Sequence, residues 1–285
     1  MKKTTLIIAL VTASLIIGCK PNSKKNDTEQ EPETVENPII MKIAKLKAAG
    51  YDIVDYHAHL KGGLTMEELL EHSKETGIAY GVAFNAGVGF PITNDSTLLA
   101  NYEQYKDYPV YMAMQAEGRE WVTMFSKENI GTFDYVFTDA MTWTDTKGRR
   151  MRLWMPEEVF VDDKDDFMDQ LVGKIVGVME DEPIDIYVNS TFLPDLLQPE
   201  YDMLWTEARM DKVIQAAVAN DIAIEINARY KIPSATFIKR AKAAGVKFSM
   251  GTNNTDKDLG TLDYAIGMIT ECGLEPDDFF KVRKK

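Results

Sequence analysis

The stretch Asp52-Ile53-Val54-Asp55-Tyr56-His57-Ala58-His59-Leu60-Lys61-Gly62-Gly63 decides how the rest of the chain is interpreted. Its apolar, β-branched start predicts a buried strand, and its two glycines predict the turn that follows the strand. Because side chains alternate between faces along a strand, His57 and His59 share one face. Two imidazoles on one rigid face can bind a transition-metal ion, and the chain has only three histidines. We therefore expect His57 and His59 to be metal ligands.

Residues 1–18 have the pattern of a signal peptide: a charged start, a short apolar stretch and a small residue before Cys19. The end of this segment, Leu15-Ile16-Ile17-Gly18-Cys19, resembles a bacterial lipobox. The resemblance implies cleavage before Cys19 and lipidation of its thiol, which would anchor the protein in the bacterial cell envelope. The alternative is an ordinary signal peptide followed by an incidental cysteine.

The chain is strongly acidic, with 32 Lys+Arg against 45 Asp+Glu and a formal net charge of −13 at pH 7. This charge disfavours nucleic acid and anionic lipid surfaces as partners, so a small molecule is the expected partner and the Cys19 lipid the only membrane contact. Residues 19–40 are polar and charged and predict a flexible tether. Residues 41–285 have a suitable length for one β/α barrel.

Strand-like and helix-like segments alternate through this main part of the chain, which predicts an α/β fold. After the His-x-His strand, six more strands are expected at 79–84, 110–114, 135–138, 184–188, 222–227 and 246–250. Each is followed by a helix or a long loop, and residues 142–163 predict a loop over one end of the molecule. Seven such units favour a single-domain (β/α)7 TIM-like barrel.

Every predicted strand ends in polar side chains. They are His57 and His59, Asn85, Gln115 and Glu117, Asp139, Asn189, Glu225 and Asn227, and Thr252 and Asn253. Right-handed crossovers between parallel strands bring all these ends to one mouth, where barrels of this kind carry their active sites. Any one of these residues alone could be a cap or a buried polar group, but the repeated pattern predicts a functional site.

Several of these motifs resemble the PHP (polymerase and histidinol phosphatase) superfamily. Asp55-x-His57-x-His59 resembles its first motif, Glu117 lies where the family has a bridging glutamate, and Glu225-Ile226-Asn227 resembles a late motif. Residues 244–251 resemble the segment that leads to the family's final metal-binding motif. The resemblance covers about residues 50–280. It implies a distorted seven-stranded β/α barrel, metal-dependent phosphoester hydrolysis and Glu117 as a third metal ligand.

The chain also departs from the family's pattern. The family's Thr-Asp-His is Phe84-Asn85-Ala86 here, and its closing Gly-Ser-Asp-x-His is Gly251-Thr252-Asn253-Asn254-Thr255. Two further family histidines correspond to Asp139 or Ala140 and to Asn189. A trinuclear centre is therefore not expected. One or at most two Zn, Mn or Fe ions could be held by His57, His59 and Glu117, with Asp139 or Glu225 as further donors.

The first hypothesis is a divergent metal-dependent hydrolase of the phosphoesterase type, with Asp139 and Glu225 as catalytic groups. The expected substrate-binding residues are Lys61, Asn85, Arg119, Asn189, Asn227, Arg229 and Asn253. The second hypothesis is a metal-free carboxylate enzyme of the glycoside hydrolase type. Its acid/base pair would come from Glu117, Glu120, Asp139 and Glu225, and the aromatic residues that could stack on sugar rings are Trp121, Trp143, Trp154 and Tyr230. The third is a lipid-anchored ligand-binding protein without catalysis.

Overall fold

The computed structural model describes residues 37–283. The predicted signal peptide, Cys19 and the tether as far as residue 36 lie outside the described residues. Among the helices of residues 37–283, none combines the length and the apolar character that crossing a membrane requires.

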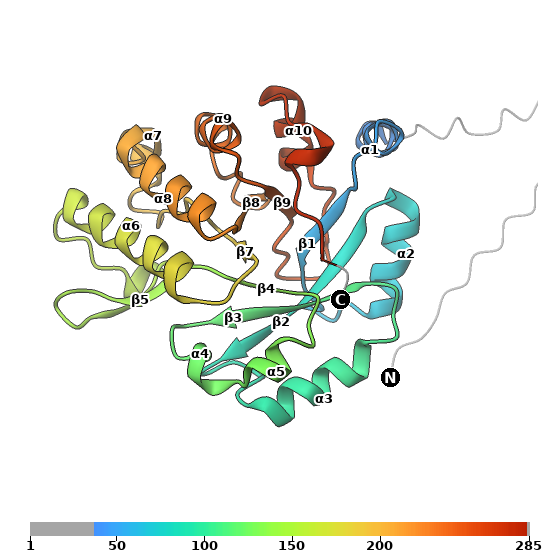
Figure 1. Ribbon diagram of the computed structural model, residues 1–285, viewed down its shortest axis with the longest axis horizontal. Helices are drawn as coiled ribbons and strands as arrows, with labels where there is room; N and C mark the ends of the chain where they lie inside the picture. The colour runs from blue at the N-terminus through green and yellow to red at the C-terminus, as the bar shows by residue number, and fades with distance from the viewer. Residues whose placement is uncertain (1–36, 284–285) are drawn as a thin grey trace, which may run out of the picture. The chain divides into compact units, whose positions relative to one another are not determined.

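Seven parallel strands close into a barrel in the order β1-β2-β3-β4-β7-β8-β9, with helices around the outside (Figure 1). The strands are β1 Val54–Ala58, β2 Ala79–Gly87, β3 Tyr111–Glu117, β4 Tyr135–Thr138, β7 Ile186–Tyr187, β8 Ala223–Asn227 and β9 Phe248–Gly251. Pairing of β1 with β9 at a single register position completes the ring. The predicted α/β seven-stranded barrel is confirmed.

The longer helices are α1 Pro38–Ala48, α2 Met66–Thr76, α3 Asp95–Tyr105, α6 Lys164–Asp181, α8 Glu207–Ala219, α9 Ala235–Ala244 and α10 Asp263–Glu271. Short helices are α4 Trp121–Met124, α5 Lys127–Ile130 and α7 Tyr201–Leu204, with 3-10 turns at Pro156–Glu158, Gln198–Glu200 and Pro276–Asp278. Local sequence explains the helix ends. Thr65 and Glu68 form the predicted capping box of α2, and Gly245 ends α9 with φ of 91°.

Three parts of the chain differ from the sequence prediction. Strands β2 and β3 extend to Gly87 and Glu117, since in-register pairing between them continues past the apolar residues. The range 142–163 was predicted as a loop but contains a hairpin, β5 Thr142–Thr144 with β6 Arg150–Arg152. Helix α1 begins at Pro38, within the range expected to be tether, because Asn37 caps it.

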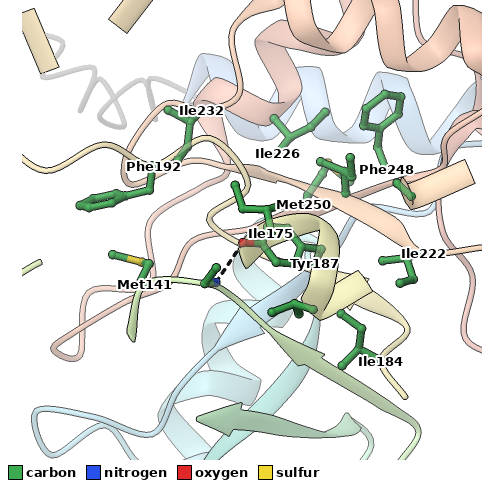
Figure 2. Packing of buried hydrophobic residues seen from close by; sticks show 14 of the residues in the cluster. Met141, Ile175, Ile184, Tyr187, Phe192, Ile222, Ile226, Ile232, Phe248 and Met250 are labelled. Atoms are coloured by element: carbon green, nitrogen blue, oxygen red, sulfur yellow. Dashed lines mark hydrogen bonds between the residues drawn. The ribbon is translucent and has the colours of Figure 1, made fainter. Parts of the chain in front are cut away.

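The large apolar core lies between the barrel and its helices. Figure 2 shows part of it, with Ile226, Phe248 and Met250 of β8 and β9 together with Ile175 of α6. In the same region the backbone N–H of Ala140 donates to the Tyr187 hydroxyl over 2.9 Å. This contact fixes the end of β4 and therefore the start of the 142–163 excursion.

A second, smaller apolar cluster fills the lower interior of the barrel, toward the N-terminal ends of the strands. Its members are Val54, Tyr56, Ala83, Ala113, Tyr135, Phe137, Ile186, Val188 and Ala223. The Tyr135 hydroxyl donates to the backbone oxygen of Tyr56 over 2.7 Å. Phe280 of the C-terminal segment packs on both tyrosine rings, with centroids 5.4 and 6.2 Å away. We call this cluster the lower layer.

Strand β1 contains a bulge that brings two consecutive side chains into the interior. Its register with β2 shifts between Asp55 and Ala58, where three residue steps in β1 face two in β2. Tyr56 packs in the lower layer against Tyr135, whereas His57 lies over Phe137 with ring centroids 4.6 Å apart. His57 thereby begins a second, polar level of the interior, which we call the upper layer.

Candidate functional site

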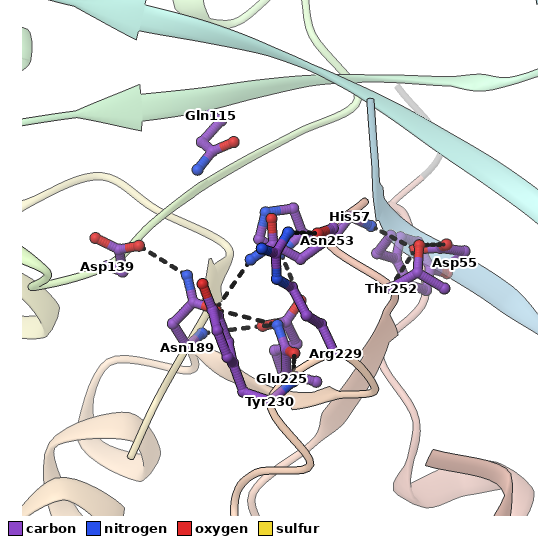
Figure 3. A network of polar contacts seen from close by, with 12 residues as sticks. Asp55, His57, Gln115, Asp139, Asn189, Glu225, Arg229, Tyr230, Thr252 and Asn253 are labelled. Carbon is purple, nitrogen blue, oxygen red and sulfur yellow. Dashed lines mark hydrogen bonds and ion pairs between the residues drawn. The ribbon is translucent and has the colours of Figure 1, made fainter. Parts of the chain in front are cut away.

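Glu225 of β8 is the centre of a buried polar network in the upper layer (Figure 3). His57 Nδ1 donates to its Oε1 over 2.6 Å, while Asn189 N and Asn227 Nδ2 donate to Oε2 over 2.9 and 3.0 Å. Burial alone would raise the pKa of this carboxyl, but the charge of His57 and these hydrogen bonds outweigh it and the pKa is lowered. Glu225 is therefore ionised and orients His57.

Gly251 makes room for this pair. A Cβ at this position would lie 2.1 Å from Glu225 Oε1 and 2.6 Å from His57 Cβ, so no larger residue fits without moving them. The glycine of the late sequence motif thus serves the packing of the network.

Asn189 joins Glu225 to a second carboxyl group, Asp139. Its Nδ2 donates to Asp139 Oδ2 over 2.8 Å, and its Oδ1 accepts from Asn227 Nδ2 over 3.0 Å and from Asn253 Nδ2 over 3.3 Å. Asn189 and Asn253 both have left-handed backbone conformations, with φ of 51° and 48°. Asparagine tolerates this region better than most residues, and strain of this kind gathers at functional sites.

The two histidines of β1 have the same hydrogen-bonding arrangement. Nδ1 of His57 donates to Glu225, and Nδ1 of His59 donates to the backbone oxygen of Ala83 over 3.0 Å. Both rings are buried, and neither Nε2 has a hydrogen-bond partner among the described residues. Burial lowers the pKa of His59 well below its usual range, with the charges of His57 and Lys61 adding to the effect. His59 is therefore neutral, with its Nε2 lone pair available.

Glu117 and Asp139 are two strand-end carboxyl groups that line the mouth of the barrel. Burial, with the charge of nearby Asp139, raises the pKa of Glu117 to about 8 although Asn85 Nδ2 donates to it over 2.6 Å. Burial also raises the pKa of Asp139, which accepts from Met141 N over 2.9 Å. Two such groups in one site can act as proton donor and proton acceptor.

A cavity of about 610 Å³ opens beside these groups and is lined by both Glu117 and Asp139. Its polar lining residues are Lys61, Asn85, Gln115, Glu117, Asp139, Asn189, Asp195, Gln198, Arg229, Asn253 and Thr255. Its apolar and aromatic lining residues are Phe90, Met141, Trp154, Phe192 and Tyr230. The size and mixed lining are typical of a small-molecule site.

Lys61 and Arg229 bring two cations to this cavity. Neither forms an ion pair with a carboxylate among residues 37–283. The ion pairs near the site join other residues: His57 with Glu225, Arg119 with Glu182 and Arg150 with Glu120. Arg229 Nη1 donates to the backbone oxygen of Asn253 over 3.2 Å, and its guanidinium lies 5.4 Å from the centroid of the Tyr230 ring. Burial lowers the pKa of Lys61; the charge of Glu117 opposes this effect and the charge of Arg229 adds to it.

The predicted site residues within the described part of the chain lie in the cavity wall, in the buried upper layer or, for Arg119, outside both. Lys61, Asn85, Glu117, Asp139, Asn189, Arg229 and Asn253 line the cavity, whereas His57, His59, Glu225 and Asn227 lie buried in the upper layer behind it. Glu225, expected to be catalytic, is not among the lining residues and supports His57 instead. Asn227, expected to bind substrate, likewise holds Glu225 and Asn189.

Arg119 lies outside the cavity lining, contrary to its expected role in substrate binding. Its guanidinium donates to Glu182 over 2.7 Å, to Thr138 Oγ1 over 2.9 Å and to the backbone oxygen of Asp139 over 2.7 Å. The arginine side chain follows a strand end but turns outward to this ion pair, because Glu182 offers it a nearly buried carboxylate. Its contribution is to hold the Asp139 turn.

Sequence reasoning missed several lining residues, among them Phe90, Met141, Phe192 and Thr255. They lie in loops and have no charge, so neither spacing nor chemistry distinguished them from ordinary packing residues. Gln115 was recognised as a strand end but not assigned a role.

The donors present fit one metal ion at most. Among the described residues no group of three or more His, Cys, Asp or Glu side chains is placed to hold a metal ion. Amide groups take the carboxylate oxygens instead, since Asn85 donates to Glu117, Asn189 to Asp139 and Asn227 to Glu225. The expected grouping of Glu117 with the histidines, and a second ion, find no support. The two unpartnered Nε2 atoms remain as suitable ligands for a single ion.

Comparison with known proteins gives similarity at the level of structure. No family model matches the sequence, and no curated protein matches it. A solved structure of histidinol phosphate phosphatase from Lactococcus lactis, complexed with Zn, L-histidinol and phosphate, matches with a TM-score of 0.53 and 13% identity. The match covers 79% of this chain and 95% of that one. A chain of an archaeal ribonuclease P structure with mature tRNA matches with a TM-score of 0.39 and 14% identity, over 78% and 83% of the two chains. The closed seven-stranded β/α barrel is thus a fold that this chain shares with a histidinol phosphate phosphatase.

Proposed function

We propose that this protein is a hydrolase of small phosphoesters that acts in the mouth cavity with one divalent metal ion on His57 and His59. The observation that carries the proposal is the pair of buried Nε2 atoms without partners, each on a ring whose Nδ1 is fixed by an oxygen acceptor. Metal-binding histidines have this arrangement, because the second hydrogen bond sets the tautomer and the orientation of the ring.

Zn, Mn or Fe(II) suits two imidazoles, with water completing the coordination. When bound, the ion would polarise the scissile phosphoryl group and lower the pKa of a bound water. Glu225 would strengthen His57 as a ligand through the 2.6 Å hydrogen bond, and the buried surroundings keep His59 neutral.

The lining cations support an anionic substrate. Lys61 follows β1 and Arg229 follows β8, strands that only β9 separates in the barrel order. Neither cation is neutralised by an ion pair within the described residues, so both can bind phosphoryl oxygens. In a chain with a formal net charge of −13, two cations in one cavity without an ion pair among residues 37–283 favour an anionic ligand there.

The strand-end carboxyl groups of Glu117 and Asp139 support proton transfer. With a pKa of about 8, Glu117 holds a proton at neutral pH and can donate it to the leaving oxygen. Asp139 lines the same cavity and can accept a proton from the attacking water. Each carboxyl group accepts a hydrogen bond from its own amide, Glu117 from Asn85 and Asp139 from Asn189, and these bonds fix the orientations of the two groups.

The test compares metal content and activity in three proteins purified without chelator or nickel: the wild type, His57→Gln/His59→Gln and His72→Ala. His72 is the matched control, because it is the third histidine and bonds to Tyr80 on the outer side of the barrel. We expect about one ion per chain in the wild type and in His72→Ala and none in the double variant, by plasma mass spectrometry. Circular dichroism checks that the double variant folds. Absence of metal in the wild type, even after addition of Zn or Mn, would contradict the proposal.

One observation favours a second candidate, a metal-free carboxylate enzyme. Glu117 and Asp139 differ in environment and share the cavity with Trp154 and Tyr230, which can stack on a sugar. Hydrolysis of a glycoside that persists in excess chelator and is lost in Glu117→Gln would support this candidate. Ligand binding without turnover on either substrate class would instead indicate a binding protein.

A further inference from the structure

Trp154 is the unusual tryptophan of this chain. The chain contains four, and Trp121, Trp143 and Trp205 are buried, with exposed fractions of 0, 3 and 1%. Trp154 is 40% exposed. Leaving so large an apolar ring in water forgoes a substantial gain from burial, so its exposure calls for an explanation.

Its place in the fold separates Trp154 from the other exposed apolar side chains. Among the described residues these include Met41, Val88, Tyr111, Val122, Phe160, Leu196, Met203 and Val218, none of which lines the mouth cavity. Trp154 does line it. An isolated apolar residue on a surface is ordinary, but one at the wall of a binding cavity is available to a ligand.

The excursion that carries Trp154 is held firmly against the barrel. Leu153, its neighbour, is buried and donates its N–H to the backbone oxygen of Met141 over 2.8 Å. Met151 on β6 is fully buried, and Arg149 bonds to Asp145 and Asp162 at the hairpin. Because both neighbouring segments are anchored, the exposed indole is held at the cavity wall before any ligand arrives, which lowers the entropic cost of binding.

The cations and Trp154 lie on different parts of the cavity wall. Lys61 follows β1 and Arg229 follows β8, on either side of β9, whereas Trp154 follows β4. Other aromatic residues line the cavity elsewhere, Phe90 after β2, Phe192 after β7 and Tyr230 after β8, but Trp154 is the exposed tryptophan among the lining residues. A molecule that fills the cavity can therefore meet the two cations at one end and the indole of Trp154 at another. An anionic group joined to a flat ring has the matching chemistry.

We propose that Trp154 is a specificity-determining residue that stacks on an aromatic ring of the substrate while Lys61 and Arg229 bind its anionic group. The inference rests on the proposed function, because it takes the anionic group of the substrate to lie at the two cations. On this proposal, Trp154 in the 142–163 excursion makes the protein prefer phosphoesters that carry an aromatic ring over those that do not.

The experiment uses phenylphosphonate and methylphosphonate, two non-hydrolysable probes that differ in the ring. Isothermal titration calorimetry measures both on the wild type, Trp154→Ala, Trp154→Phe and the control Met203→Ala, an exposed apolar residue outside the cavity. We expect phenylphosphonate to bind the wild type about tenfold more tightly than methylphosphonate. The preference should disappear in Trp154→Ala and largely remain in Trp154→Phe and Met203→Ala.

Acrylamide quenching gives an independent measurement, since the exposed Trp154 dominates the quenchable fluorescence. Phenylphosphonate should protect the wild-type protein from quenching more than methylphosphonate does at equal occupancy. A ring preference that is absent, or that survives in Trp154→Ala, would overturn the role of Trp154 and leave the proposed function standing. Failure of both phosphonates to bind the wild type would overturn the anionic substrate as well.

Discussion

The lower and upper layers of the barrel interior are built from the same strands but follow opposite rules. The lower layer is apolar and aromatic, and its two tyrosine hydroxyls both have partners: Tyr135 donates to the backbone oxygen of Tyr56, and Tyr56 donates to that of Phe280. The upper layer buries Glu225, His57 and His59, and leaves two imidazole nitrogens without partners. In the lower layer the buried hydroxyl groups have hydrogen-bond partners, whereas in the upper layer two imidazole nitrogens remain free to bind a ligand such as a metal ion.

This difference predicts that the two layers respond in opposite ways to substitution. Side chains of the lower layer stabilise the fold through burial and packing. Carboxyl groups near the mouth carry the cost of desolvation, so replacing them should lower function and relieve that cost.

The largest effect is expected for Tyr135→Ala in the lower layer. The side chain is fully buried among Tyr56, Phe137 and Phe280, and its loss would leave a cavity. We expect the free energy of unfolding to fall by about 4 kcal/mol, measured by urea titration. A fall of less than 1 kcal/mol would show that the C-terminal segment closes over the gap and that the lower layer is not the rigid part.

Glu225→Gln tests the support that the upper layer gives to His57. The substitution keeps the shape of the side chain but removes the charge that meets His57 Nδ1. We expect Zn affinity to fall about 10–100-fold, measured against a chromophoric chelator. Glu180→Gln, the same change at an exposed position of α6, is the control. Unchanged Zn affinity in Glu225→Gln would separate Glu225 from metal binding.

Glu117→Gln should stabilise the protein at alkaline pH. The carboxyl has a pKa of about 8 in the folded state against 4.5 normally, so between these values the folded state binds the extra proton. The free energy of unfolding of the wild type therefore falls as pH rises through this window. Glu117→Gln removes that dependence and should exceed the wild type by about 1–3 kcal/mol at pH 8. Unfolding titrations from pH 5 to 8 measure it, and parallel profiles would contradict the prediction.

The smallest effect is expected for Tyr135→Phe, which keeps the ring and removes one hydrogen bond. The backbone oxygen of Tyr56 then loses its buried partner, and we expect a loss of about 1 kcal/mol of unfolding free energy. Tyr108→Phe, which removes a surface bond to Glu67, should change stability by less. Equal effects in the two variants would weaken the claim that the lower layer depends on complete pairing.

Much of this arrangement follows from the sequence alone. Alternating apolar segments predicted seven strands, because burial on a strand or helix has a local period that can be read residue by residue. The capping box at Thr65 and Glu68 was predicted for the same reason, since both partners lie within one turn. The polar residues at the strand ends, including Asn85, Glu117 and Asp139, were correctly expected at one mouth because parallel connection leaves them no other place.

The tertiary structure alone decided which of these residues face the cavity and which lie behind it. The bulge at Tyr56 and His57 depends on pairing with β2, and the bond between His57 and Glu225 joins residues 168 positions apart. The outward turn of Arg119 likewise depends on Glu182, a distant partner. Burial, the raised pKa of Glu117 and the position of Trp154 are properties of the packed barrel, because each depends on neighbours that only folding brings together.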